Sequence, residues 1–245
     1  MKITILGNCG PYPRAGEACS GYLLEDGEYK ILIDCGNGTL SRLLGKINSL
    51  DEIDAIILTH LHSDHISDAM VLRYAVGINK EKGNLRKSIP LYAPPDPVET
   101  FEKIQFKDAF ILNVLKESTT INFGGMKISF RLMSHPIETY GVIVQKDAKK
   151  FVYSSDTRYC NNIVEMSKDA DLLLCECGVM ERDRTDDTYH LSGIEVGQIA
   201  KLSNAKKVLI THLWPGYNFD EVLNEVKTEF DGNVEIAREL QTYEI

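Results

Sequence analysis

Four side chains that can bind metal ions lie within six residues of this chain, directly after an apolar segment. Residues 53–59 read Ile-Asp-Ala-Ile-Ile-Leu-Thr, which predicts a buried strand, and His60-Leu-His62-Ser-Asp64-His65 follows at once. In an extended backbone residues two apart share a face, so His60 and His62 can bind one ion together. Asp64 and His65 are offset from that pair, a spacing that suits a second ion. Imidazole and carboxylate groups bind zinc, manganese and iron, so we predict a metal site.

Other candidate ligands also follow predicted strands. His135 comes after residues 127–133, Asp156 comes after residues 150–154, and His212 comes after residues 207–210. Because each group stands at a strand end, we expect the ligands to converge along one sheet edge.

Asp34 ends another predicted strand, residues 29–34, and two roles are open for it. Its carboxylate could cap the helix predicted over residues 39–47. It could instead orient a ligand histidine through the second ring nitrogen, as metal sites usually require.

A weak internal repeat indicates the fold class. Residues 55–61, Ala-Ile-Ile-Leu-Thr-His-Leu, resemble residues 207–213, Lys-Val-Leu-Ile-Thr-His-Leu, which suggests two halves of about 120 residues. Each half reads mostly as strands followed by helices. We therefore expect an α/β fold, an αββα sandwich of two mixed β-sheets flanked by helices. Nothing marks a linker, so we expect one domain over residues 1–245.

Composition excludes some partners. The formal net charge of −9 leaves no global positive field for a long nucleic acid. The basic cluster at residues 80–87 reads as a solvated loop. The six cysteines show no Cys-x-x-Cys spacing, and we expect most of them to be reduced and structural. No signal peptide and no run of ~18 apolar residues stands out, so we expect a cytoplasmic protein without a membrane partner.

Together these motifs resemble the metallo-β-lactamase-fold hydrolases, and within them the ribonuclease Z-like branch. The similarity covers nearly the whole chain. It rests on the Asp34-x-Gly36 turn, the signature at residues 60–65, His135, the segment Tyr153-Ser-Ser-Asp156-Thr157, His190-Leu-Ser192 and Thr211-His212.

The resemblance implies a site with two divalent metal ions, zinc before manganese or iron. It assigns seven ligands, with His60, His62 and His135 on one ion, Asp64, His65 and His212 on the other, and Asp156 bridging both. It further implies that a hydroxide shared by the ions is the nucleophile and that Asp64 can take the proton from the bridging water that forms this hydroxide. His190 would protonate the leaving oxygen or steady the phosphate. The alternative for His190 is a loop histidine that caps the next helix.

Departures from the relatives narrow the function. True metallo-β-lactamases generally carry a cysteine where Asp156 stands, which disfavours antibiotic hydrolysis. Ribonuclease Z carries a long arm for transfer RNA between the counterparts of His135 and Asp156. Here only 20 residues lie between these positions, and they read as a hairpin. We therefore expect a phosphodiesterase acting on small phosphodiesters such as cyclic nucleotides.

Two other functions stay open at this level. The same ligand set would serve a thioester or lactone hydrolase of this fold. A non-catalytic protein could use the metal site only for binding. The resemblance also allows a homodimer, because relatives often pair.

Overall fold

The computed structural model describes residues 1–245, which form two compact units. Unit 1 comprises Met1–Leu115 and Glu239–Glu244, and unit 2 comprises Lys116–Arg238 and Ile245. These bounds agree with the two halves suggested by the internal repeat, while a single domain over residues 1–245 stays a prediction. None of the helices is both long enough and apolar enough to cross a lipid bilayer.

Unit 1 is built on one mixed sheet of seven strands in the order β14-β1-β2-β3-β4-β5-β6. The neighbours from β14 to β3 are antiparallel, and those from β3 to β6 are parallel. The strands are β1 (Lys2–Gly7), β2 (Gly21–Asp26), β3 (Tyr29–Cys35), β4 (Ala55–Ile57), β5 (Ile89–Ala93), β6 (Phe110–Val114) and β14 (Thr242–Glu244). The helices are α1 (Thr39–Leu44), α2 (Ser63–Ile66), α3 (Ala69–Glu81) and α4 (Val98–Lys103), with a 3-10 turn, η1, at Leu50–Glu52.

The sequence pattern explains most of this sheet. The sequence predicts strands over residues 2–7 and 89–93, and β1 and β5 have these bounds. A turn follows Asp26 and joins β2 and β3 as a hairpin. The central strand β4 is buried at all three positions, as expected for a parallel strand covered on both faces. Strand β14 was not predicted. It pairs antiparallel with β1 and sets Lys2 opposite Glu244.

The pattern of residues 66–77 predicts one continuous helix after the metal-binding motif, whereas the structure has two helices, α2 and α3. The break occurs at Ser67-Asp68, where the backbone N–H of Asp68 donates to the carbonyl of Cys35 at 3.0 Å. The Asp68 carboxylate also accepts a hydrogen bond from the N–H of Leu40 at 2.9 Å. These bonds fasten the break to the end of β3 and the start of α1, and so fix α2 beside β3.

Unit 2 has a second mixed sheet of seven strands in the order β13-β12-β11-β10-β9-β8-β7. Its strands are β7 (Thr120–Phe123), β8 (Met126–Leu132), β9 (Tyr140–Lys146), β10 (Lys149–Tyr153), β11 (Leu172–Glu176), β12 (Lys207–Thr211) and β13 (Asn233–Ile236). Its helices are α5 (Asn161–Ser167), α6 (Gly193–Ser203) and α7 (Phe219–Glu229), and a 3-10 turn, η2, lies at Glu181–Asp183.

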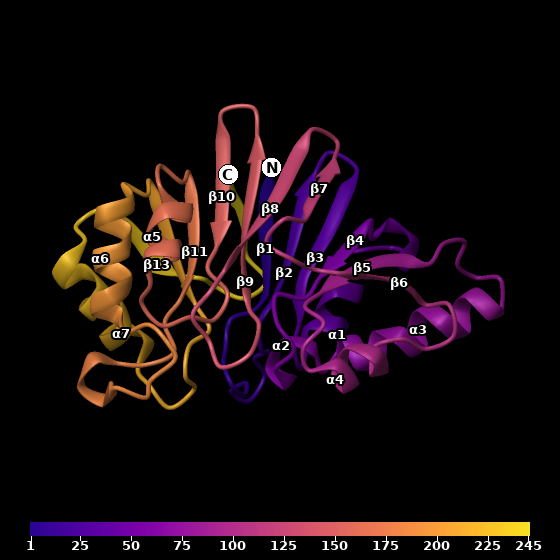
Figure 1. Ribbon diagram of the computed structural model, residues 1–245, viewed down its shortest axis with the longest axis horizontal. Helices are drawn as coiled ribbons and strands as arrows, with labels where there is room; N and C mark the ends of the chain where they lie inside the picture. The colour runs from indigo at the N-terminus through magenta and orange to yellow at the C-terminus, as the bar shows by residue number, and fades with distance from the viewer. The chain divides into compact units, whose positions relative to one another are not determined.

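The core of unit 2 lies between its helices and its sheet, and α6 and α7 run side by side there (Figure 1). Ser192 three residues before Glu195 predicts a capping box. Helix α6 begins with this capping box, because Ser192 accepts from the N–H of Glu195 while Glu195 accepts from the N–H of Ser192. The core includes strand residues Val152, Leu173 and Val208 and helix residues Ile163, Val196 and Val222.

The two sheets share one topology. Counted from β14 in unit 1 and from β7 in unit 2, the first three strand pairs of each sheet are antiparallel and the last three are parallel, so β1 to β6 correspond to β8 to β13. By this order β4 corresponds to β11, and β12 corresponds to β5. The two similar segments at residues 55–61 and 207–213 therefore stand at different positions in the two sheets.

Candidate metal centre

Unit 1 contributes four candidate ligands from a single loop. His60 and His62 lie between β4 and α2, and Asp64 and His65 lie in α2. The ring centroid of His60 is 4.8 Å from that of His62 and 4.1 Å from that of His65. The motif therefore gathers three imidazoles in one place as soon as the chain leaves the buried strand.

Asp34 orients one of these histidines. Its carboxylate is fully buried and accepts hydrogen bonds from the N–H of Thr59 at 2.8 Å and from the Thr59 hydroxyl. It also accepts from Nδ1 of His65 at 2.9 Å, while Nε2 of His65 faces the carboxylate of Asp64 at 3.6 Å. This contact fixes the tautomer of His65 and presents Nε2 as the ligand atom. The residue at the N-cap of α1 is Gly38, so the orienting role predicted for Asp34 is the one that the structure has.

The turn after Asp34 lies against the ligand loop. A Cβ atom built on Gly36 would lie 1.8 Å from the carbonyl oxygen of Asp64. Only glycine fits there, because any side chain would push the backbone of the metal-binding motif away. This explains the glycine of the Asp34-x-Gly36 turn.

Unit 2 contributes its candidate ligands from three separate strand ends. His135 follows β8, Asp156 follows β10 and His212 follows β12. The three side chains are each 2% exposed. Nε2 of His212 lies 3.2 Å from Oδ2 of Asp156, and Nε2 of His135 lies 4.0 Å from the same oxygen. Two imidazole nitrogens thus converge on one carboxylate oxygen.

The ring of His190 lies close to both candidate histidine ligands of unit 2. Its centroid is 5.5 Å from that of His135 and 5.1 Å from that of His212, with which it stacks at an interplanar angle of 17°. A Cβ atom on Gly178 would lie 2.9 Å from Cγ of His190, so this glycine gives the ring room. The alternative role of His190 as a helix cap was wrong, because Ser192 caps α6.

Glu176 is a candidate functional residue that the sequence pattern did not single out. It ends β11, is fully buried, and accepts a hydrogen bond from Nδ1 of His190 at 3.0 Å. The N–H groups of Thr157 and Gly178 also donate to it, at 2.8 and 3.0 Å. The signal was present in the sequence, because an acidic residue within the apolar run at residues 172–177 needs buried partners.

The chemistry of the donors fits divalent cations in both units. Neutral imidazole nitrogens and carboxylate oxygens are the ligands that zinc, manganese and iron take. Within unit 1 the ligand atoms of His60 and His62 lie within 4.8 Å of each other, as do those of Asp64 and His65. Within unit 2 a ligand atom of Asp156 lies within 4.8 Å of one from His135 and of one from His212. The ligand atoms of Glu176, His190 and His212 also lie within 4.8 Å of one another. Since three N–H groups already donate to Glu176, we interpret it as orienting His190.

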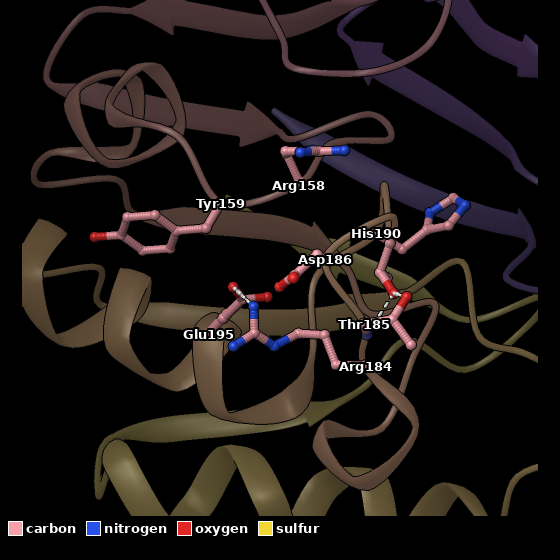
Figure 2. Close-up of a pocket in the computed structure, with 8 residues that line it drawn as sticks. Arg158, Tyr159, Arg184, Thr185, Asp186, His190 and Glu195 are labelled. Atoms are coloured by element: carbon pink, nitrogen blue, oxygen red, sulfur yellow. Dashed lines mark hydrogen bonds and ion pairs between the residues drawn. The ribbon is translucent and has the colours of Figure 1, made fainter.

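A polar pocket with a volume of about 230 Å³ opens beside His190 (Figure 2). Arg158, Arg184 and Glu195 are among the residues that line it. Each comes from unit 2, and Arg158 lies two residues after Asp156.

Comparison with known proteins places the chain among metal-dependent hydrolases. A family model described as "Beta-lactamase superfamily domain" matches residues 29–213. The "Probable metallo-hydrolase YhfI" of Bacillus subtilis is 34% identical over 238 residues, which is 97% of each protein. The "Ribonuclease Z" of Archaeoglobus fulgidus is 23% identical and is aligned over 100% of this chain and 98% of its own.

The crystal structure of YhfI from Bacillus subtilis matches this structure with a TM-score of 0.93 at 32% identity. The match covers 99% of this chain and 98% of that one. The predicted fold class, two mixed β-sheets flanked by helices in the αββα arrangement, is confirmed.

Proposed function

Because the chain belongs to the beta-lactamase superfamily and is a metallo-hydrolase of that fold, we propose that it is a dinuclear phosphodiesterase acting on small phosphodiesters. The resemblance to this family and to its ribonuclease Z-like branch is confirmed. The observation that carries the proposal is the pair of His190 and Glu176 beside the ligands of unit 2. It supplies a proton donor and phosphate contact that a metal-binding protein without turnover would not need.

The proposed ligands are the seven residues of the resemblance. His60, His62 and His135 would hold one ion, Asp64, His65 and His212 the other, and Asp156 would bridge them. Bound ions would polarise a phosphoryl oxygen and lower the pKa of a water molecule to about 7. Zinc is the first candidate metal, and manganese or iron would suit the same donors.

The protein's own groups then have distinct tasks. Asp64, held beside His65, would accept the proton of the attacking water. Glu176 accepts from Nδ1 of His190, which fixes the ring and stabilises its protonated form. The other ring nitrogen, Nε2, would then donate a proton to the leaving oxygen or a hydrogen bond to the phosphate.

Two features support a small substrate over transfer RNA. The segment between His135 and Asp156 is the compact hairpin of β9 and β10. Three of the four basic residues at 80–87 pair with acidic groups, and Lys80 lies 2.6 Å from Asp108. A net charge of −9 adds to this. A cytoplasmic location and a homodimer stay predictions.

The test is hydrolysis of bis(p-nitrophenyl) phosphate by the metal-reconstituted protein, with metal content measured on the same samples. We expect turnover by wild type and a loss of about a hundredfold in His190→Ala, with both metal ions retained. Asp187→Ala is the matched control, since Asp187 is exposed on the loop that carries His190. A wild type that holds two ions, leaves phosphodiesters intact and cleaves thioesters or lactones would overturn the proposal.

A further inference from the structure

None of the proposed metal ligands lines the pocket beside His190. Its volume of about 230 Å³ lies below the range of about 300–1,000 Å³ typical of sites for drug-sized ligands. A water molecule takes about 30 Å³ in the liquid, so the pocket has room for one substituent of several heavy atoms. Because His190 lines the pocket, a substrate held at the metal ligands of unit 2 could extend a substituent into it.

Arg158 supplies a cation to this pocket. Its guanidinium stacks on the ring of Tyr189, 3.9 Å from the ring centroid, and its backbone N–H donates to the carbonyl of Ser134 at 3.0 Å. Nε of Arg158 is buried without a hydrogen-bond partner, and the side chain makes no ion pair. The aromatic ring therefore positions the guanidinium, and no carboxylate neutralises it.

The second arginine of the pocket is neutralised. Arg184 pairs with Glu181 at 3.1 Å and with Glu195 at 3.3 Å. Asp186 acts on the same guanidinium, and these acidic groups raise the pKa of Arg184. Figure 2 shows Arg184, Glu195 and Asp186 together on one side, while the side chain of Arg158 extends toward the side where His190 lies. The pocket is thus acidic at one end and positive at the end near His190.

We infer that Arg158 binds a second phosphate group of the substrate, so that the preferred substrates are phosphodiesters that carry an additional phosphate. This inference rests on the proposed phosphodiesterase function. A guanidinium with free N–H groups is the side chain best suited to bind phosphate through two parallel hydrogen bonds. The carboxylates of Glu195 and Asp186 at the other end of the pocket repel anions. The pocket therefore has room for one phosphate group near Arg158 and disfavours a polyphosphate chain.

Two hydroxyl groups of the pocket add to this assignment. Thr185 and Thr188 line it, and their hydroxyl groups form a hydrogen bond of 3.2 Å with each other, which leaves one of the two hydroxyl hydrogens to donate to a ligand. Hydroxyl groups can donate to the further oxygens of a tetrahedral phosphate, which offers more acceptors than a planar carboxylate. The pocket therefore presents donors of the kind that a phosphate group accepts from.

The test compares two ligands that differ only in the second phosphate. Thymidine 5′-monophosphate and thymidine 3′,5′-bisphosphate are titrated by calorimetry into metal-loaded wild type, Arg158→Gln, Arg158→Lys and Arg182→Gln. Arg182 is the matched control, because it lies on the same loop as Arg184 but outside the pocket and pairs with Glu221. Melting temperature and metal content establish that each variant is folded and loaded.

We expect wild type and the control Arg182→Gln to bind the bisphosphate about tenfold more tightly than the monophosphate, because the second phosphate gains one charge-assisted contact. Arg158→Gln should lose this advantage. Arg158→Lys keeps the charge but lacks the planar guanidinium, so its ratio of bisphosphate to monophosphate affinity should be intermediate. This variant also tests the inference if Arg158→Gln does not fold. Equal affinities in wild type, or an advantage that survives in Arg158→Gln, would overturn the inference.

Cleavage of bis(p-nitrophenyl) phosphate in the same wild-type samples separates this inference from the proposed function, because that diester has no second phosphate. Turnover without a bisphosphate advantage would leave the phosphodiesterase and remove the phosphate site. An advantage that depends on Arg158, without turnover of any diester, would leave the phosphate site and remove the phosphodiesterase.

Discussion

The two units have the same sheet order but present their candidate ligands in different ways. Unit 1 uses one loop, in which four candidate ligands stand within six residues after β4. Unit 2 uses the ends of β8, β10 and β12, which are far apart in sequence. A shared topology thus brings side chains to strand ends, whereas the sequence decides whether one loop or several supply them. A motif search finds the first arrangement directly and the second only when the strands are predicted as well.

Each unit also has one buried carboxylate that orients one histidine. Asp34 accepts from His65 at 2.9 Å in unit 1, and Glu176 accepts from His190 at 3.0 Å in unit 2. The difference lies in the partner, because His65 is a proposed metal ligand and His190 is a proposed substrate contact. Substitution of the two carboxylates should therefore affect different measurements.

The largest effect is expected from Asp156→Ala, which removes the carboxylate on which His135 and His212 converge. Loss of a group that only orients a ligand costs 10–100-fold in affinity or activity, so loss of the proposed bridging ligand should cost more than about a hundredfold in kcat/KM. Metal analysis should show that metal content falls as well. His62→Ala, which removes one of the three histidines of the unit 1 loop, should be milder. Equal losses of kcat/KM in Asp156→Ala and His62→Ala would contradict the proposal that Asp156 bridges the two ions.

Glu176→Gln should lower kcat by about a hundredfold and leave the metal content unchanged. The amide can still contact the ring of His190, but it carries no charge to stabilise the protonated form. Steady-state kinetics and metal analysis on one sample decide this. A loss of metal together with activity would show instead that Glu176 supports the ligands.

Asp34→Asn should have the opposite signature. We expect metal affinity to fall about 10–100-fold, because an amide has one acceptor oxygen for the donors that two carboxylate oxygens serve, on Thr59 and His65. At saturating metal most of the activity should return. Competition with a chelator measures the affinity, and activity that stays low at saturation would contradict a role limited to the ligand.

The smallest effect concerns the sheets themselves, where both units carry an aspartate just before a parallel strand. Asp54 accepts from the N–H of Lys30 at the start of β3, and Asp171 accepts from the N–H of Lys150 at the start of β10, both at 2.9 Å. Asp171→Asn and Asp54→Asn should each lower the free energy of unfolding by about 2 kcal/mol at pH 7, as judged by urea denaturation. Unequal losses would show that the two sheets are not stabilised alike.

Acid sharpens this last test for Asp171. Burial raises the pKa of its carboxyl, but hydrogen bonds from Nζ of Lys206 and the N–H of Lys150 outweigh burial and hold the pKa below its ordinary value. The carboxylate therefore stabilises the fold above the ordinary pKa of about 3.9 and loses this effect as the pH falls through the lower folded value. The difference between wild type and Asp171→Asn should be present at pH 7 and close as the pH falls below that ordinary value.

Features that depend on neighbouring residues were predicted correctly from the sequence, whereas features that depend on contacts distant in sequence were not. The capping box of α6 and the bounds of β1 and β5 follow from neighbouring residues and were predicted from the sequence. The break between α2 and α3 depends on bonds from Asp68 to β3 and α1, which no local pattern reveals. Glu176 was missed because its meaning depends on His190, a partner 14 residues away.

The internal repeat shows the same limit. Residues 55–61 and 207–213 are similar because each has a buried parallel strand followed by a histidine. Their strands, β4 and β12, hold different places in the two sheets. Similar local environments favour similar residues, so the two segments are alike in sequence. The correspondence between the units follows from the strand order instead.

The pairing of β14 with β1 has a consequence for how the protein is made. This ladder joins Lys2 to Glu244, so the ribosome must synthesise all of unit 2 before the sheet of unit 1 can receive its last strand. Until then the outer edge of β1 offers unpaired backbone groups, the kind of edge at which nascent chains associate wrongly. Premature termination within unit 2 would therefore leave unit 1 with an unpaired edge strand. Such fragments should aggregate and bind chaperones.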